Sequence, residues 1–509
     1  MPELSDESSK AQRLTQLKKE QFMEHTETTA RPAETSTQAS ASAPLPVPHV
    51  YRGRMITGNA IKHVSRDLGQ GFCTPKIELD DLVWPRAESG PAFDVPVEQI
   101  IDFLVELGPR LHLDVNPLMQ AALESMIKVS PLGRRILENC YRDIPNLFLR
   151  EVIEDELRVS LGDARLVDGW VERTLRGRPS RLRAFPPRLV HILAGNSPMV
   201  AAMTVMRAAL TKGVHLLKLP SNDLFTATAI LRTMAEIDPN HPVTQSFSAA
   251  YWRGGDENVE SILYRPQYFD KIVVWGGDSA VRHVMRYAGP GLELVAFDPK
   301  VSISLIGREA FSSDEVLREV ARAGAADVLS FNQDACNASR YQFIEGDEDD
   351  ADRYCEQLAL ALGEDYRYGD GQGPLVPSDI REAVDVLREM EPLYRVFGGY
   401  DGKGLVIRSD EMVDFHPICK TVNVVPVGSL RDGARYATVA TQTVGIYPPH
   451  RVTEVRDALA CAGVQRMVAL GESISDGVGG YPHDGMFPIH RFMKWVSEES
   501  GPNQQETRQ

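Results

Sequence analysis

Short apolar segments alternate with helical patterns through the middle of the chain, and this alternation constrains the fold most. Segments 189–194, 214–219 and 271–275 are rich in Leu, Ile and Val and have the length of buried strands. Runs over 199–209 and 224–237 have the length and spacing of helices. Strands that alternate with helices form a mostly parallel sheet covered on both faces, so the sequence predicts a doubly wound α/β fold.

The α/β pattern resumes after residue 300, and a helical region precedes it. Strands are expected at 301–306 and 341–344, with a helix over 313–324 between them. Residues 96–175 have helical spacing, and Asn116-Pro117 has the pattern of a helix N-cap followed by proline. Further helices are expected at 352–362, 378–389 and 451–461, and further strands at 421–427, 443–446 and 464–470.

Composition excludes several functional classes. Asp and Glu number 71 against 55 Lys and Arg, giving a net charge of -16, which speaks against binding to nucleic acid or anionic membranes. The 6 cysteines form no CxxC pair, so no zinc or redox motif is present, and their spread fits a reducing cytoplasm. We expect no metal site, no membrane span and no signal peptide. The Ser-, Thr- and Glu-rich residues 1–48 are expected to be disordered.

One cysteine lies where a nucleophile would be well placed. Cys336 occupies a short polar loop, Asn332 to Arg340, between a predicted helix and a predicted strand. Such a thiol can attack an electrophilic carbonyl. The alternative is that Cys336 is a small buried hydrophobic residue, as cytosolic cysteines often are.

Four segments, in their order along the chain, resemble the aldehyde dehydrogenase superfamily. They are Ala194-Gly195-Asn196-Ser197-Pro198, Lys218 with Ser221, Leu292-Glu293-Leu294 with Pro299, and Asn332-Gln333-Asp334-Ala335-Cys336. The resemblance implies an aldehyde-dehydrogenase-like α/β fold, with a doubly wound cofactor-binding domain and an α/β catalytic domain. It also implies a homo-oligomer in the cytoplasm.

The resemblance also implies roles for individual residues. Cys336 would be the nucleophile, Asn196 would help to form the oxyanion hole, and Glu293 would deprotonate Cys336. Lys218 and Ser221 would meet the adenosine ribose of a nicotinamide cofactor. Each has a simpler alternative: Asn196 a turn residue, Glu293 a solvated carboxylate at a strand end, and Lys218 a lysine reaching from a strand end to solvent.

A pair of glycines offers a weaker binding signal. Gly276 and Gly277 follow a predicted strand and open a helix, where backbone N–H groups can seat a phosphate. A plain tight turn explains the same residues equally well.

The sequence departs from the superfamily pattern at two places. Val295-Ala296-Phe297 replaces Gly-Gly-Lys, and Val413 stands where the family has the Glu that holds the nicotinamide ribose. Asp414 and His416 are candidates to compensate for that missing Glu.

Several features are more similar to one branch, the acyl-CoA reductases that resemble the reductase subunit of the bacterial bioluminescence fatty acid reductase complex. They are the helical N-terminal part, the Cys336 loop, His416-Pro417, and Pro482-His483-Asp484-Gly485-Met486. This similarity implies NADPH-dependent reduction of a long-chain fatty acyl-CoA to the aldehyde through a Cys acyl-enzyme, and an acyl-transferring synthetase as partner. The alternatives are an aldehyde dehydrogenase that oxidises aldehyde to acid and a catalytically silent scaffold.

The residue three positions after Lys218 favours NADPH over NADH. NAD-selective relatives place there a Glu that bonds the ribose hydroxyls, whereas this chain has Ser221 and so lacks the charge that would repel a 2′-phosphate. Asp223 lies close enough in sequence to supply such a charge instead, which keeps NADH as the alternative.

The resemblance divides the chain into parts. We expect a disordered tail at 1–48, the helical part and cofactor-binding domain at 49–296, the catalytic domain at 297–480, and a C-terminal segment at 481–509.

Overall fold

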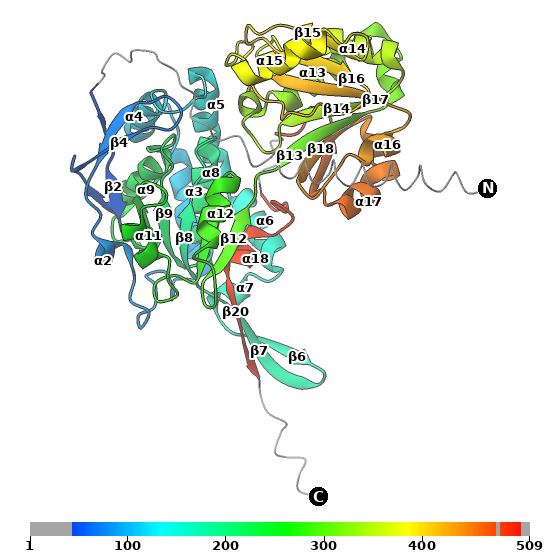
Figure 1. The fold of residues 1–509 in the computed structure, drawn as a ribbon. Helices are drawn as coiled ribbons and strands as arrows, with labels where there is room; N and C mark the ends of the chain where they lie inside the picture. Colours follow the sequence, from blue (N-terminus) through cyan, green and yellow to red (C-terminus); the bar gives the residue numbers. More distant parts are fainter. Residues whose placement is uncertain (1–42, 475–478, 500–509) are drawn as a thin grey trace, which may run out of the picture. The chain divides into compact units, whose positions relative to one another are not determined.

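The computed structural model describes residues 43–474 and 479–499, and these form two compact units. The first unit contains the described residues up to Asp298 together with 479–499, and the second contains Pro299–Ile474. Both are built around a seven-stranded sheet (Figure 1). The mixed α/β fold predicted from the sequence is therefore confirmed.

The sheet of the first unit is doubly wound. Its strands, in spatial order, are β12 (Glu293–Phe297), β11 (Lys271–Trp275), β8 (Arg188–Ile192), β9 (Val214–Lys218), β10 (Phe247–Ala250), β2 (His49–Tyr51) and β3 (Arg54–Ile56). The strands from β12 to β10 run parallel, and β2 and β3 add antiparallel edges. The strand order reverses between β8 and β11, and a doubly wound sheet binds ligands outside the carboxyl ends at such a point.

Alternating side chains of this sheet pack on opposite faces. Val190, Ile272 and Val274 face one core, which α11 (Glu257–Leu263) and α12 (Asp278–Met285) complete. Leu189 and Val273 face the other. Because both faces are buried, these strands are continuously apolar, which is why they could be recognised in the sequence.

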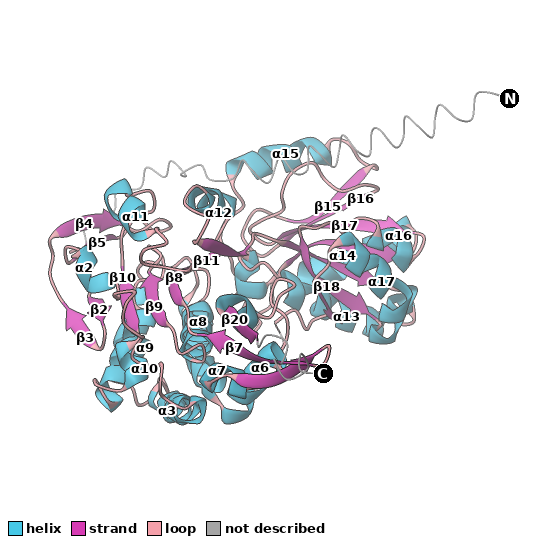
Figure 2. Ribbon diagram, turned by 90° about the horizontal axis from the view of Figure 1, so that it is seen from below, coloured by secondary structure: helices cyan, strands magenta, loops and turns pink. Residues whose placement is uncertain are grey.

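Helices dominate the rest of the first unit (Figure 2). The longer ones are α3 (Val97–Arg110), α4 (Pro117–Met126), α5 (Arg134–Asp143), α6 (Arg150–Leu161), α8 (Pro198–Ala209) and α9 (Thr226–Ile237). Short helices are α2 (Leu79–Leu82), α7 (Arg165–Asp168), α10 (Pro242–Gln245), α18 (Pro488–Phe492) and the 3₁₀ turn η1 (Ile144–Phe148). Asn116 caps α4 as predicted, since its side chain accepts the backbone N–H groups of Leu118 and Met119.

Two sequence predictions for the first unit are wrong in part. Residues 171–175 are not helical, because β6 (Val171–Leu175) pairs with β7 (Arg178–Phe185) and β7 pairs with β20 (Lys494–Glu499). This antiparallel ribbon projects from its unit in Figure 1. Residues 43–48 are not disordered, because β1 (Leu45–Pro46) pairs with β5 (Gly71–Thr74), beside β4 (Ile61–Val64). The remainder of the predicted tail, 1–42, lies outside the described residues.

The second unit has the strand order β15 (Tyr394–Gly398), β16 (Leu405–Ser409), β17 (Thr421–Val427), β14 (Ser339–Glu345), β13 (Val301–Ile306), β18 (Thr441–Tyr447) and β19 (Arg466–Ala469). Only β15 is antiparallel among these described strands. Helices α13 (Asp314–Val328) and α14 (Glu348–Ala361) pack on one face. Helices α15 (Ser378–Arg388), α16 (Leu430–Ala434) and α17 (Val452–Ala462) pack on the other. The 3₁₀ turns are η2 (Arg308–Phe311), η3 (Ser330–Gln333) and η4 (Pro449–Arg451).

None of the helices in the described ranges combines the length and the apolar character that crossing a bilayer requires.

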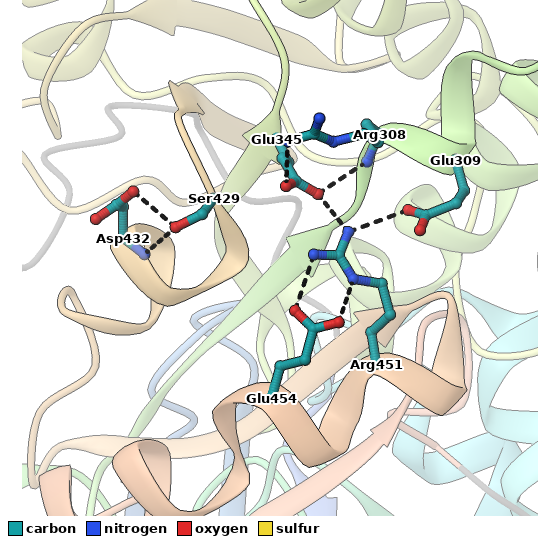
Figure 3. Close-up of polar contacts among 7 residues, drawn as sticks. All are labelled: Arg308, Glu309, Glu345, Ser429, Asp432, Arg451 and Glu454. Carbon is teal, nitrogen blue, oxygen red and sulfur yellow. Dashed lines mark hydrogen bonds and ion pairs between the residues drawn. The ribbon is translucent and has the colours of Figure 1, made fainter.

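A charged network ties together the carboxyl ends of three strands in the second unit (Figure 3). Arg451, after β18, bonds Glu345 at the end of β14 and Glu309 after β13, and it also pairs with Glu454. Arg308 bonds Glu345 from the other side at 2.7 Å. Burial opposes ionisation of Glu345, but the hydrogen bonds from Arg451 and Arg308 outweigh it and lower its pKa to about 2.

We predict that Glu345→Gln destabilises the protein by about 2 kcal/mol near neutral pH, because Arg451 and the backbone N–H of Arg308 lose a charged hydrogen-bond acceptor, while Arg451 keeps its pairs with Glu309 and Glu454. A carboxyl whose folded pKa is depressed stabilises the fold above its unfolded pKa of about 4.5, and this contribution fades as the pH falls towards 2. Thermal unfolding of both proteins across that window measures the effect. Glu454→Gln is the matched control, since this more exposed partner of Arg451 should contribute less than about 1 kcal/mol. Equal losses in the two variants would contradict the account.

Candidate active site

Cys336 lies at the amino edge of the second unit's sheet, in the loop that leads into β14. Its sulfur accepts a hydrogen bond from Nε2 of Gln442, the second residue of β18, at 3.1 Å. Its backbone carbonyl accepts a hydrogen bond from Oγ of Ser302, the second residue of β13, at 2.8 Å. Two neighbouring strands therefore fix the cysteine, which remains partly exposed. This arrangement is unlike that of a small hydrophobic residue buried in a core.

The backbone before Cys336 is strained. Phe331, Asn332 and Gln333 have φ of 49°, 53° and 71°, in the left-handed region that residues other than glycine rarely adopt. Cys419 and Lys420 share this conformation, with φ of 54° and 61°. Strain of this kind persists only where surrounding contacts enforce it, and it is concentrated at functional sites.

Hydrogen bonds join the two strained segments. Gln333 donates from Nε2 to the carbonyl of Thr421 at 2.7 Å. Asn332 accepts the backbone N–H of Asp370 at 2.8 Å. The buried Lys420 donates to the carbonyls of Asp370 and Gly371 at 2.9 and 2.8 Å. These contacts enforce the left-handed backbone and so set the approach of the chain to Cys336.

A buried arginine also reaches this loop. Arg340 donates to the carbonyls of Gln333 and Pro417, and burial lowers its pKa. The guanidinium interacts electrostatically with Asp334 and Tyr341 and, more weakly, with Cys419 and Cys336. Sequence reasoning missed Arg340, Lys420 and Gln442, because none of the three belongs to a recognisable motif.

Residues 413–416 lie where the family has its ribose-binding Glu, and they carry no buried carboxylate. Val413 is buried, and its backbone N–H bonds the side chain of Asn423. Burial, together with Arg340, lowers the pKa of His416 to about 3, so this imidazole is neutral near pH 7. Asp414 is exposed.

Asn196 lies in the turn after β8, at the carboxyl edge of the first unit's sheet. The next residue, Ser197, caps α8 by accepting the backbone N–H of Met199 at 3.3 Å, so Asn196 is not the cap. The turn is tightly packed: a Cβ atom on Gly195 would lie 1.9 Å from Oδ1 of Asn222. Glycine is therefore required before Asn196.

Lys218 ends β9 at the same edge and is buried. Its Nζ lies 5.5 Å from the ring centroid of Trp252, and it has no hydrogen bond or ion pair with a described residue. Burial lowers its pKa to about 8. A buried ammonium without a hydrogen-bond acceptor is costly, so hydroxyl or phosphate oxygens supplied by a ligand would be stabilising there.

Ser221 follows in the turn after β9 and contacts a part of the chain that sequence reasoning did not connect with it. Its Oγ accepts the backbone N–H of Arg66 at 3.2 Å, and Asn222 donates to Asp67 at 2.7 Å. Asp223 is turned away into the core, where it accepts the backbone N–H of Thr226 and burial raises its pKa to about 6. Asp223 therefore does not supply a repelling charge beside Ser221, while Asp67, paired with Arg66, is the nearby acid.

Gly276 and Gly277 follow β11, whereas Asn196 follows the neighbouring strand β8. The strand order reverses between these two strands, so the two turns lie on opposite sides of that point. Gly277 precedes the first residue of α12, and a Cβ on it would meet nothing within 4 Å. The turn is therefore open on this side, and it does not distinguish a phosphate site from a plain tight turn.

Glu293 lies at the opposite edge of the same sheet. It begins β12, pairs in register with Lys271, and so lies level with Leu189 near the start of β8. The strand length alone separates this level from the end of β8 by about 10 Å. Glu293 forms ion pairs with Lys271 at 2.9 Å and with Arg491 at 3.0 Å. Glu293 and Asn196 therefore lie at opposite edges of one sheet. The acid–base role of Glu293 stays a prediction.

The structure thus brings Asn196, Lys218, Ser221, Gly276 and Gly277 to one edge of the first unit's sheet. Cys336 belongs to the second unit, with Gln442, Arg340 and Lys420 around its loop. Among the residues that the structure describes, no group of three or more His, Cys, Asp or Glu side chains could hold a metal ion.

A family model described as "Acyl-CoA reductase (LuxC)" matches residues 92–495, which cover both units. The chain belongs to the acyl-CoA reductase (LuxC) family. It is therefore an enzyme, an oxidoreductase that acts on an acyl thioester. This membership confirms the family inferred from the sequence motifs.

Curated relatives of this chain are named long-chain acyl-protein thioester reductases. One from Photorhabdus laumondii subsp. laumondii is 31% identical over 359 residues, covering 69% of this chain and 70% of the relative. One from Vibrio harveyi is 27% identical over 418 residues, covering 80% of this chain and 83% of the relative.

Solved structures with the same fold are aldehyde dehydrogenases. The NADP-dependent glyceraldehyde-3-phosphate dehydrogenase from Bacillus halodurans matches with a TM-score of 0.66 at 12% identity, covering 90% of this chain and 100% of that one. The NAD-dependent benzaldehyde dehydrogenase from Corynebacterium glutamicum matches with a TM-score of 0.65 at 13% identity, covering 91% and 100%. The chain therefore has the aldehyde-dehydrogenase-like fold that its sequence predicted.

Proposed function

We propose that this enzyme reduces a long-chain fatty acyl thioester to the fatty aldehyde, with NADPH as reductant and Cys336 as the acylated nucleophile. The observation that carries the proposal is the partly exposed Cys336, held through both its sulfur and its carbonyl within a loop of strained backbone. A scaffold without activity would have no need of such a loop, and strain of this kind is concentrated at functional sites.

The proposed chemistry begins with attack of the Cys336 thiolate on the thioester carbonyl carbon. A new C–S bond forms, the bond to the carrier sulfur breaks, and the carrier leaves as a thiolate that takes a proton from water. A nicotinamide cofactor supplies the hydride that reduces the Cys336 thioester. The resulting tetrahedral adduct releases the aldehyde and returns the thiolate of Cys336.

Both tetrahedral species carry a negative oxygen, and we propose Asn196 and the backbone N–H of Cys336 as its donors. One such donor contributes roughly 3–4 kcal/mol to a transition state. Ser197, rather than Asn196, caps α8, so the side chain of Asn196 is not required for the helix end.

No carboxylate base is needed in this scheme once Cys336 is a thiolate. The Cys336 thiolate is consumed and the carrier thiolate is released, so the acyl transfer itself moves no proton. We therefore leave Glu293 out of the chemistry, in agreement with its place at the opposite sheet edge from Asn196. Hydrolytic release of an acid, by contrast, needs a base that activates water, and Glu293 is the candidate for that base.

The residues at the carboxyl edge fit a nicotinamide cofactor. The buried ammonium of Lys218 offers its N–H groups to ribose hydroxyls or to a 2′-phosphate. Ser221 adds a hydroxyl, and the exposed guanidinium of Arg66 lies in the adjacent hairpin. These groups favour NADPH, whereas the Asp67 carboxylate that pairs with Arg66 keeps NADH as the competing cofactor.

The names of the relatives favour a protein-bound acyl group over acyl-CoA as the physiological thioester. An acyl-transferring synthetase is therefore the partner we propose, and a homo-oligomer remains our prediction for the assembly. Assays of NADPH oxidation with acyl-CoA and acyl-protein thioesters of rising chain length test the function. Aldehyde must appear in step with NADPH loss; acid formed from added aldehyde, with no thioester reduction, would support the hydrolytic dehydrogenase instead.

We predict opposite outcomes for the two polar residues that the sequence singled out in the first unit. Asn196→Ala should lower kcat about 10²–10³-fold through loss of an oxyanion donor, with little change in melting temperature. Glu293→Gln should leave kcat within about threefold, because this side chain makes only partly exposed ion pairs. Steady-state kinetics and thermal unfolding of both variants measure this. A large loss of kcat in a folded Glu293→Gln protein would restore Glu293 as the base.

We predict that Ser221→Glu raises KM for NADPH far more than KM for NADH. Two unit charges about 4 Å apart repel by roughly 4 kcal/mol at an effective dielectric of 20, and the 2′-phosphate is present only in NADPH. Ser221→Ala is the matched control and should affect the two cofactors similarly. If the wild type prefers NADH, or if Ser221→Glu raises both KM values equally, Ser221 does not select the cofactor.

A further inference from the structure

The side chain of Gln442 is oriented towards the sulfur of Cys336. Its Nε2 lies 3.1 Å from Sγ, and its Oε1 accepts a hydrogen bond from the hydroxyl of Thr443 at 3.4 Å. Its backbone carbonyl accepts the N–H of Gln465, so the strand that carries it is held in place. Gln442 is 7% exposed, and a buried amide donor strengthens a hydrogen bond to a charged acceptor.

A buried positive charge lies near the same sulfur. Arg340 is 8% exposed, and it donates to two backbone carbonyls and to no carboxylate among the described residues. Its Nε has no hydrogen-bond partner in the part of the chain that the structure describes. Asp334 is the largest electrostatic partner of Arg340, and the guanidinium also interacts with Cys336, so its positive charge would favour a thiolate there.

We propose, resting on the function above, that Gln442 is a catalytic residue whose amide donates a hydrogen bond to the sulfur of Cys336 and, with the buried guanidinium of Arg340, holds that sulfur as a thiolate. Gln442 touches the reacting atom, whereas Arg340 acts through its charge. The thiol proton leaves to solvent before the substrate arrives. The enzyme then begins each cycle with the nucleophile already ionised, and needs no side chain as base.

Other titratable groups lie near Gln442 and Arg340, and none of them would stabilise a Cys336 thiolate in their place. Asp334 interacts with Arg340 but is exposed, so solvent screens its charge. His416 is neutral near pH 7, because burial and Arg340 lower its pKa. Burial raises the pKa of Cys419, and Asp334 and Asp379 add to that effect while Arg340 opposes it. Cys336 is thus the thiol that also receives a side-chain amide donor.

Alkylation of Cys336 by iodoacetamide as a function of pH tests the proposal without thioester or cofactor. The modified peptide is quantified by mass spectrometry, so the other cysteines do not interfere. Gln442→Met keeps the side-chain volume and removes the donor, and it should raise the pH midpoint of alkylation by about one unit. Gln442→Glu adds a like charge beside the sulfur and should raise the midpoint further. Arg340→Met should raise it by about one to two units.

Ser302→Ala is the control. It removes the hydrogen bond to the backbone carbonyl of Cys336 and leaves Gln442 and Arg340 unchanged. Its midpoint should match that of the wild type. Unchanged midpoints in folded Gln442→Met and Arg340→Met proteins would overturn the proposal, as would an equal rise in Ser302→Ala. Should Arg340→Met fail to fold, the alkylation midpoints of the two Gln442 variants still test whether Gln442 stabilises the thiolate. A wild-type enzyme that fails to reduce thioesters, with the shifts intact, would reject the proposed function and not this inference.

Discussion

Hydrogen bonds from β13 and β18 to Cys336 are the interactions on which the rest of the site depends. Ser302 fixes the carbonyl and Gln442 the sulfur, and the backbone N–H of Thr443 in turn bonds the hydroxyl of Ser302. β13 and β18 are neighbours in a parallel sheet, and a parallel sheet of this kind needs helices that bury both of its faces. The sheet therefore supplies more than a core, since its amino edge positions the sulfur that we propose as the nucleophile.

The candidate residues lie at different edges of the sheets of the two units. The first presents Asn196, Lys218 and two turns at carboxyl ends, where doubly wound sheets bind ligands. The second presents its cysteine at the amino edge, while its carboxyl edge is occupied by the ion pairs of Arg451 and Glu345. Stability and reactivity in the second unit are thus placed at opposite ends of the same strands.

The sequence predicted features that short-range patterns encode. Continuous Val- and Ile-rich runs identified β11 and β13, and Asn116-Pro117 located the start of α4. The polar ribbon formed by β6 and β7 was missed, because its side chains are largely exposed and give no hydrophobic signal. β15 and β16 were also missed, and Gly398 and Gly404 flank their connection.

The site was harder to predict than the fold, because it depends on strand register between distant segments. Gln442 is 106 residues from Cys336, and no local motif records that β18 lies beside β13. Glu293 shows a different limit: a match without gaps to a known motif suggested its role, but the motif does not state that Glu293 begins β12, at the amino edge of its sheet. Nothing in the sequence indicates that Arg340, in a buried strand, donates to backbone carbonyls and to no carboxylate of the described residues.

The central claim is that Cys336 carries the acyl group, and one measurement tests it most directly. The wild-type enzyme is incubated with a long-chain acyl thioester in the absence of reductant, and the adduct is mapped by peptide mass spectrometry. The account predicts one acyl group on Cys336, lost on addition of NADPH with release of the aldehyde, and no adduct in Cys336→Ala. An acyl group on Cys419 or Cys355, or labelling that persists in Cys336→Ala, would contradict it.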